Sequence, residues 1–202
     1  MYIIGVTGPS GAGKSVVSQY LRKFHGYKLI NADKVYHRII SGPSDCVNEL
    51  VEHFGKEILN EEGGIDRKAL AALVFGEENK DKLELLNKIT HKYVIAKINK
   101  RVEKFTEEGE KFCVIDAPLL IEAGINEMCD LVYAVVAYKE NRAERIAERD
   151  GIDFKDALLR IESQKPDKFY SDNCDVLLRN NLGFRELFYV VDMSLRYRGL
   201  IK

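Results

Sequence analysis

The chain has 202 residues, of which 46% are hydrophobic and 31% are charged, and its formal net charge is −1. This composition is typical of a globular protein with a sizeable core, and the near-neutral charge argues against a dedicated nucleic-acid binder, whose phosphate contacts need a basic excess. The four cysteines stand far apart without a CxxC pair, so we interpret them as free thiols. No signal-like start and no membrane-spanning apolar run is present, and we therefore expect a cytoplasmic protein without a membrane partner.

The first thirty residues alternate between strand and helix patterns. A short β-branched run at 2–7 predicts a buried strand, and apolar residues at helical spacing from Lys14 to Phe24 predict a helix that stops at Gly26. The segment KLIN at 28–31 predicts a second strand. Strand, glycine-rich turn, helix and strand form a βαβ unit, from which parallel sheets are built.

Helical patterns dominate the middle of the chain. We expect helices over 34–40, 43–55, 66–75 and about 79–107, with Asp66 as the N-cap of the third. No strand pattern interrupts them, which indicates a helical insertion in the connections of the sheet.

Strand patterns return in the second half of the chain, between further helices. We expect strands at 112–117, 130–137 and 174–181, helices at 139–149, 153–163 and 184–198, and a polar loop at 163–173. The sequence therefore predicts an α/β fold of three layers with about five parallel strands.

The segment GPSGAGKS at 8–15 matches the phosphate-binding pattern G-x-x-x-x-G-K-[ST], and it stands between a predicted strand and a predicted helix. Glycines let successive N–H groups surround a phosphate, the lysine reaches the β- and γ-phosphates, and the serine hydroxyl ligates Mg²⁺. The pattern predicts a P-loop NTPase fold that binds ATP with Mg²⁺. The expected ATP-binding residues of the loop are Gly8, Gly11, Ala12, Gly13, Lys14, Ser15 and Val16.

Two absences narrow the class of nucleotide-binding protein. The chain has no NKxD segment, which a GTPase would carry for guanine. Asp116 ends an apolar strand but precedes alanine, whereas motor and transporter ATPases place Asp-Glu there. Together with the size of the chain, this favours a small-molecule kinase, in which Asp116 either assists Mg²⁺ or only ends its strand.

A kinase also needs an acceptor site and cations near the transferring phosphoryl group. Asp33 follows the second strand at the carboxyl edge of the sheet, where ligands bind, and either acts on the acceptor hydroxyl or caps the next helix. Arg142, Arg145 and Arg149 recur along one charged helix. They form either a solvated face paired with glutamates or a lid that brings an arginine to the triphosphate.

Several segments, in order along nearly the whole chain, resemble dephospho-coenzyme A kinases: the loop itself, NADKVYHRII, FGKEIL with GGIDRKAL and VF, ITHKYV, DAPLLIEAG, RIAERDG, RIESQ and CDVLLRNNLG. The resemblance implies ATP-dependent phosphorylation of the ribose 3′-hydroxyl of dephospho-CoA, the last step of coenzyme A synthesis. It implies further roles for Lys14 of the loop and for residues outside the loop: catalysis by Asp33 with Lys14 and Arg149, ATP-phosphate contact by Arg149, acceptor binding by Asp33, Arg67 and His91, and a place near adenine for Asn180 or Asn181.

The resemblance also implies how the chain is organised. We expect a single kinase domain with a core of about 1–31, 110–138 and 174–202, an acceptor-binding helical region of about 32–109, and a lid of about 139–173. The expected partners are ATP and dephospho-CoA, and the oligomeric state is left open.

The chain departs from the family pattern at two positions expected near the acceptor and at one beside the asparagines expected near adenine. Asn31 replaces the first acid of the usual D-A-D, Lys92 replaces the proline that usually follows the histidine, and one extra residue precedes Gly183. Two alternatives therefore remain at this stage: a nucleoside or nucleotide kinase of the same fold, and a non-catalytic ATP-binding regulatory protein.

Overall fold

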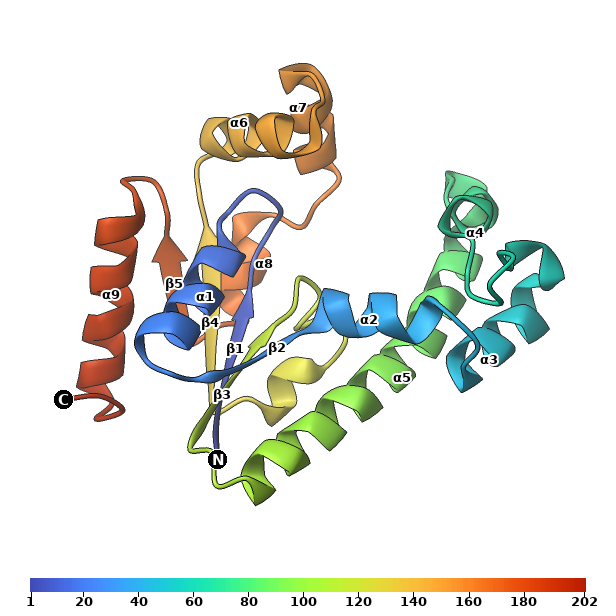
Figure 1. The fold of residues 1–202 in the computed structure, drawn as a ribbon. Coiled ribbons are helices and arrows are strands. Elements are labelled where there is room, and N and C mark those ends of the chain that lie inside the picture. Colours follow the sequence, from blue (N-terminus) through green and yellow to red (C-terminus); the bar gives the residue numbers. More distant parts are fainter. The chain divides into compact units, whose positions relative to one another are not determined.

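The computed structural model describes residues 1–202, apart from the side chain at position 77. The chain divides into two compact units (Figure 1), one made of residues 1–30 and 105–202 and the other of residues 31–104. Each unit is built from a different kind of secondary structure.

The first unit contains a five-stranded sheet with the order β2-β3-β1-β4-β5. Its strands are β1 (Tyr2–Thr7), β2 (Lys28–Asn31), β3 (Phe112–Asp116), β4 (Leu131–Val136) and β5 (Val176–Arg179). The pairings of β1 with β3, of β1 with β4 and of β4 with β5 are parallel. The predicted parallel α/β sheet is confirmed. Because β1 is the middle strand, the loop after it leaves from the centre of the carboxyl edge, where open parallel sheets bind ligands.

Helices cover both faces of this sheet. Alternate residues of β4 point to opposite faces: Tyr133 and Val135 join the core formed with α1 (Lys14–Phe24) and α9 (Phe184–Tyr197), whereas Ala134 and Val136 pack with Tyr170 of α8 (Asp167–Asp172). Figure 1 shows α1 and α9 beside the strands. The sheet is therefore the middle layer of three, as the sequence predicted.

The short helix α8 corrects one prediction, since the polar segment 163–173 was expected to be a loop. Pro166 is the N-cap of α8, and Tyr170 is buried against the sheet. A six-residue helix is too short to be stable on local propensity alone, so its packing on the sheet decides its structure. Sequence patterns do not report that contact.

The remaining helices of the first unit form a pair. Helices α6 (Lys139–Asp150) and α7 (Phe154–Glu162) bury a small cluster of their own, formed by Ala143, Ile146, Ala157 and Ile161. A 3-10 turn, η3 (Ile125–Met128), precedes β4. None of the helices in the described part of the chain combines the length and the apolar character that crossing a bilayer requires.

The second unit is helical. It contains α2 (Ala32–Ile40), α3 (Asp45–Phe54), η1 (Lys56–Ile58), α4 (Arg67–Val74), η2 (Glu77–Asn79) and most of α5 (Lys80–Glu107). Asp66 caps α4 as predicted, because its Oδ1 accepts hydrogen bonds from the backbone N–H groups of Lys68 and Ala69. Within this unit, the structure has helices close to the expected ranges.

Candidate functional site

The loop between β1 and α1 has a backbone that only glycine permits at its key turns. Gly8 has φ 137°, and a Cβ atom there would lie 2.1 Å from the backbone oxygen of Val135. Gly13, the N-cap of α1, has φ 101°, and a Cβ atom there would lie 2.3 Å from Nδ2 of Asn180. Positive φ and these close approaches exclude larger residues. The backbone of the loop is therefore closely packed against Val135 at Gly8 and against Asn180 at Gly13.

Four consecutive carbonyl groups of this loop, at residues 9–12, each accept a hydrogen bond from a side chain. The donors are Lys14 Nζ to Pro9 (3.1 Å), Arg142 Nε to Ser10 (3.0 Å), Arg145 Nη1 to Gly11 (3.2 Å) and Asn180 Nδ2 to Ala12 (2.9 Å). Carbonyl groups in an irregular loop have no ladder partner, so side-chain donors satisfy them, and the Pro9 carbonyl also accepts from the backbone N–H of Ala12 at 3.3 Å. These side chains hold the carbonyl groups of the loop and fix its backbone.

Gln164 connects the loop with α6. Its Oε1 accepts from the backbone N–H of Ser10 at 2.8 Å and from Nη2 of Arg142 at 2.8 Å. Arg142 is 5% exposed, and burial lowers the pKa of its guanidinium, while Asp167 at 3.9 Å acts in the opposite direction. The solvated-face interpretation is therefore wrong for Arg142.

Arg149 differs from the other two arginines of α6 because it reaches a side chain of the loop. Its Nη2 donates to Oγ of Ser10 at 3.3 Å, and Nε donates to Oδ1 of Asp150 at 2.7 Å. Asp150 also binds Arg160, and the hydrogen bond from Arg149 is the main cause that lowers the pKa of Asp150 to about 2. At neutral pH an ionised carboxylate therefore holds Arg149 next to the loop.

The first turns of α1 lie beside a buried carboxylate. Oγ of Ser18 donates to Oδ2 of Asp116 at 2.8 Å, and Asp116 is 4% exposed. Ser15 lies three residues before Ser18, so both are on the same side of α1. The described residues contain no cluster of three His, Cys, Asp or Glu that could hold a metal ion. A hydroxyl and one nearby carboxylate suit Mg²⁺, which keeps several waters and takes further oxygens from phosphates.

The two adjacent asparagines have different surroundings. Asn180 is buried, and its side chain supports the loop through the carbonyl of Ala12. Oδ1 of Asn181 accepts from the backbone N–H of Tyr138 at 2.8 Å, next to the start of α6. That one of them lies near adenine stays a prediction.

The helical unit contains the three residues expected to bind the acceptor. Asp33 is the second residue of α2 and is exposed, and Oδ1 of Asn31 accepts from the backbone N–H of Lys34 at 2.8 Å. Asn31 is therefore the N-cap of α2, and the interpretation of Asp33 as a cap is wrong.

Arg67 and His91 lie on other helices of the same unit. Arg67 begins α4, and burial raises the pKa of Tyr36 on α2 while the nearby charge of Arg67 opposes that rise. His91 is half-buried on α5, and burial lowers the pKa of its imidazole. The structure thus places Arg67 close enough to α2 to influence Tyr36.

Sequence reasoning included Gln164 only as the end of the segment RIESQ, without a role, and did not foresee that Arg142 and Arg145 bind backbone carbonyls. Arg142 and Ser10 are 132 positions apart, and Arg145 and Gly11 are 134 apart. A local pattern contains no information about such pairs. Their charges on one helix indicated a function but not their partners.

Comparisons with known proteins agree on one family. A family model described as dephospho-CoA kinase matches residues 2–186. A dephospho-CoA kinase of Fusobacterium nucleatum is 40% identical over 190 residues, which cover 94% of this chain and 95% of that protein. One from Dehalococcoides mccartyi is 34% identical over 198 residues, covering 98% of both chains.

Solved structures of similar fold include another member of that family. A dephospho-CoA kinase from Campylobacter jejuni has a TM-score of 0.68 and 26% identity, covering 98% of both chains. The structure of TT1252 from Thermus thermophilus has a TM-score of 0.79 and 26% identity, covering 97% of both chains. A shikimate kinase from Acinetobacter baumannii, with a TM-score of 0.58 and 12% identity over 98% of this chain and 94% of that one, shares the fold.

Gln164→Ala tests the support of the loop. The substitution removes the acceptor for Ser10 N–H and for buried Arg142, and we expect ATP affinity to fall about tenfold, since losing such a partner costs about 1–3 kcal/mol. ATP dissociation constants measured by titration check this. Gln164→Glu keeps carboxyl oxygens in place of Oε1 and should retain most of the affinity. Equal ATP affinity in wild type and Gln164→Ala would contradict the support role.

Proposed function

This chain belongs to the dephospho-CoA kinase family, which phosphorylates dephospho-CoA with ATP in coenzyme A synthesis, and we propose that the residues described above perform that reaction. The observation that carries the proposal is the loop with four side-chain-supported carbonyl groups and Arg149 beside it. A loop fixed before the nucleotide binds loses little entropy and needs little reorganisation when charge develops on the phosphates.

The loop and α1 bind the donor in this proposal. Backbone N–H groups of the loop and the positive end of α1 face the phosphates, and Lys14 moves its ammonium from the Pro9 carbonyl to the β- and γ-phosphates. Arg149, held by Asp150 next to Ser10, neutralises charge on the transferring group. Gly8, Gly11, Ala12, Gly13, Ser15 and Val16 complete this binding segment.

Asp33 acts on the acceptor. Its exposed carboxylate accepts the proton of the ribose 3′-hydroxyl while that oxygen bonds to the γ-phosphorus and the bond to the β–γ bridging oxygen breaks. Arg67 attracts the negatively charged acceptor. Burial lowers the pKa of His91, so its imidazole is neutral near pH 7 and offers a hydrogen bond without a charge. These three roles rest on the resemblance together with the place of each residue in the helical unit.

Mg²⁺ belongs to the proposed site as the ion that neutralises the phosphate oxygens. The residues that would hold it are Ser15, through its hydroxyl, and Asp116, whose buried carboxylate lies against Ser18 on the same side of α1.

We also propose a reducing, cytoplasmic location. All four cysteines are free thiols. Burial raises the pKa of Cys46 to about 11 and those of Cys113 and Cys129 to about 12, so these thiols are protonated and unreactive at neutral pH.

An acceptor panel tests the activity itself. In a coupled ADP-release assay with Mg²⁺ and ATP, we expect turnover with dephospho-CoA and background rates with adenosine, AMP and shikimate. Rapid turnover of a nucleoside or nucleotide without a response to dephospho-CoA would identify a different acceptor, and ATP binding without turnover of any acceptor would indicate a regulatory protein.

Asp33→Asn tests the base. We expect kcat with dephospho-CoA to fall about 10²–10⁴-fold, the usual contribution of a positioned base, with little change in ATP affinity. Asp81→Asn is the matched control, because Asp81 is another exposed carboxylate in the first turn of a helix. Steady-state kinetics and ATP titration of both variants check this, and a normal kcat in Asp33→Asn would remove Asp33 from the chemistry.

Asp116→Asn tests the cation site. The amide oxygen keeps an acceptor for Ser18, but the charge that favours Mg²⁺ is lost. We expect the Mg²⁺ concentration for half-maximal nucleotide binding to rise about tenfold, with metal-free nucleotide binding nearly unchanged. Fluorescence titration of an ATP analogue at several Mg²⁺ concentrations measures it, and an unchanged Mg²⁺ dependence would leave Asp116 with a structural role only.

A further inference from the structure

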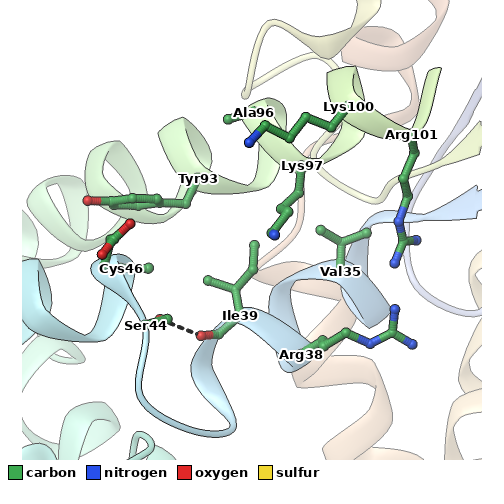
Figure 2. Close-up of a pocket in the computed structure, with 11 residues that line it drawn as sticks. Val35, Arg38, Ile39, Ser44, Cys46, Tyr93, Ala96, Lys97, Lys100 and Arg101 are labelled. Atoms are coloured by element: carbon green, nitrogen blue, oxygen red, sulfur yellow. Dashed lines mark hydrogen bonds between the residues drawn. The ribbon is translucent and has the colours of Figure 1, made fainter. Parts of the chain in front are cut away.

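The helical unit contains a cavity of about 740 Å³ that has no part in the roles assigned above. It is bordered by one face of α2, the start of α3 and one face of α5 (Figure 2). Its size lies within the range of small-molecule binding pockets, about 300–1,000 Å³. None of the residues that border it was singled out from the sequence.

Helix α5 brings three cations to this cavity. Tyr93, Ala96, Lys97, Lys100 and Arg101 stand at spacings of three, four, seven and eight residues and therefore share one face of the helix. Figure 2 shows the side chain of Lys97 extending from α5 toward Ile39 of α2. The basic residues of this segment thus face a cavity in the structure.

Helix α2 supplies a fourth cation and an apolar wall. Arg38 is exposed and borders the cavity with Val35 and Ile39, which are 2% and 8% exposed. The spacing 35, 38, 39 places them on one face of α2. The cavity therefore combines charged ends with a buried apolar floor.

The positive charge of the cavity is not neutralised within the described part of the chain. Arg38, Lys97, Lys100 and Arg101 face it with a single carboxylate, Asp45, which gives a formal charge of +3 from four cations and one anion. Among the described residues, no salt bridge or side-chain hydrogen bond involves any of the four cationic groups. Like charges gathered in one cavity repel one another, and a bound anion removes that cost.

The carboxylate of α3 that lies close to α5 is already occupied. Oε1 of Glu49 accepts from Nζ of Lys92 at 2.8 Å, and its Oε2 accepts from the hydroxyl of Tyr93 at 2.6 Å. These hydrogen bonds lower the pKa of Glu49, so it stays ionised with Lys92 as its partner. Its charge is thereby matched by a cation outside the set of four, and neither Glu49 nor Lys92 borders the cavity.

We propose that this cavity binds an organic diphosphate, with its phosphate oxygens on Arg38, Lys97, Lys100 and Arg101 and its uncharged arm along Val35 and Ile39. Arginine and lysine are the side chains that bind phosphate oxygens, and apolar walls accept the carbon chain that such a group carries. Two molecules could supply this diphosphate. One is dephospho-CoA, and this assignment rests on the function proposed above. The other is a separate phosphorylated effector, whose binding does not depend on that function.

Two double variants of the full chain test the site. Lys97→Gln/Lys100→Gln removes two charges from the cavity, and Lys82→Gln/Lys88→Gln removes two exposed charges from the same helix away from the cavity. The phosphate loop is first saturated with a non-hydrolysable ATP analogue, and free Mg²⁺ is held constant. Inorganic pyrophosphate is then titrated calorimetrically, and thermal melts verify that both variants are folded.

We expect pyrophosphate affinity to fall at least about tenfold in the cavity variant and less than about twofold in the control, since charged hydrogen bonds are the strong ones. If the KM for dephospho-CoA rises in parallel with kcat unchanged, the acceptor supplies the diphosphate. If only pyrophosphate affinity falls, a separate effector occupies the cavity. Equal affinities in both variants, or no pyrophosphate binding to the wild type, overturn the proposal. The titration needs no turnover, so its result is independent of whether dephospho-CoA is phosphorylated.

Discussion

The four carbonyl groups at residues 9–12 are the constraint on which the nucleotide site depends. An irregular loop has no ladder to satisfy its backbone, and buried carbonyl groups without donors are costly. Here the donors are side chains of α1, α6 and the segment after β5. When Lys14 turns to the phosphates, Arg142, Arg145 and Asn180 still hold three of these carbonyl groups, and the Pro9 carbonyl keeps the backbone N–H of Ala12. The loop is therefore preorganised to present the N–H groups that phosphates need.

The same contacts place three arginines of α6 against the loop. Arg142 and Arg145 anchor the helix to the loop backbone, and Arg149, one turn further along, is held by Asp150 next to Ser10. The loop and α6 are therefore joined by hydrogen bonds from three arginines of one helix. If all three arginines pointed toward the phosphates, the carbonyl groups of Ser10 and Gly11 would lose the donors that Arg142 and Arg145 supply.

In the helical unit, positive charge is concentrated around one cavity and is not neutralised by neighbouring carboxylates among the described residues. Glu49, Lys92 and Tyr93 satisfy one another at the surface, whereas the cations around the neighbouring cavity have one carboxylate among them. The same unit also shows how α2 begins. Asn31 is the N-cap of this helix, and the carboxylate of Asp33 is exposed. The asparagine that departs from the family pattern thus has a structural role as the cap of α2.

The sequence alone determined the parallel α/β fold, the phosphate loop, the Asp66 cap and the family, because each depends on residues that are close in the chain or on an ordered series of motifs. It did not determine helix α8, the hydrogen bonds of Gln164, Arg142 and Arg145, or the cavity between α2 and α5. Those features come from side chains that meet across more than a hundred positions, from packing on the sheet, or from faces of separate helices. Only tertiary structure decided them, since local propensity and spacing carry no information about which distant groups satisfy one another.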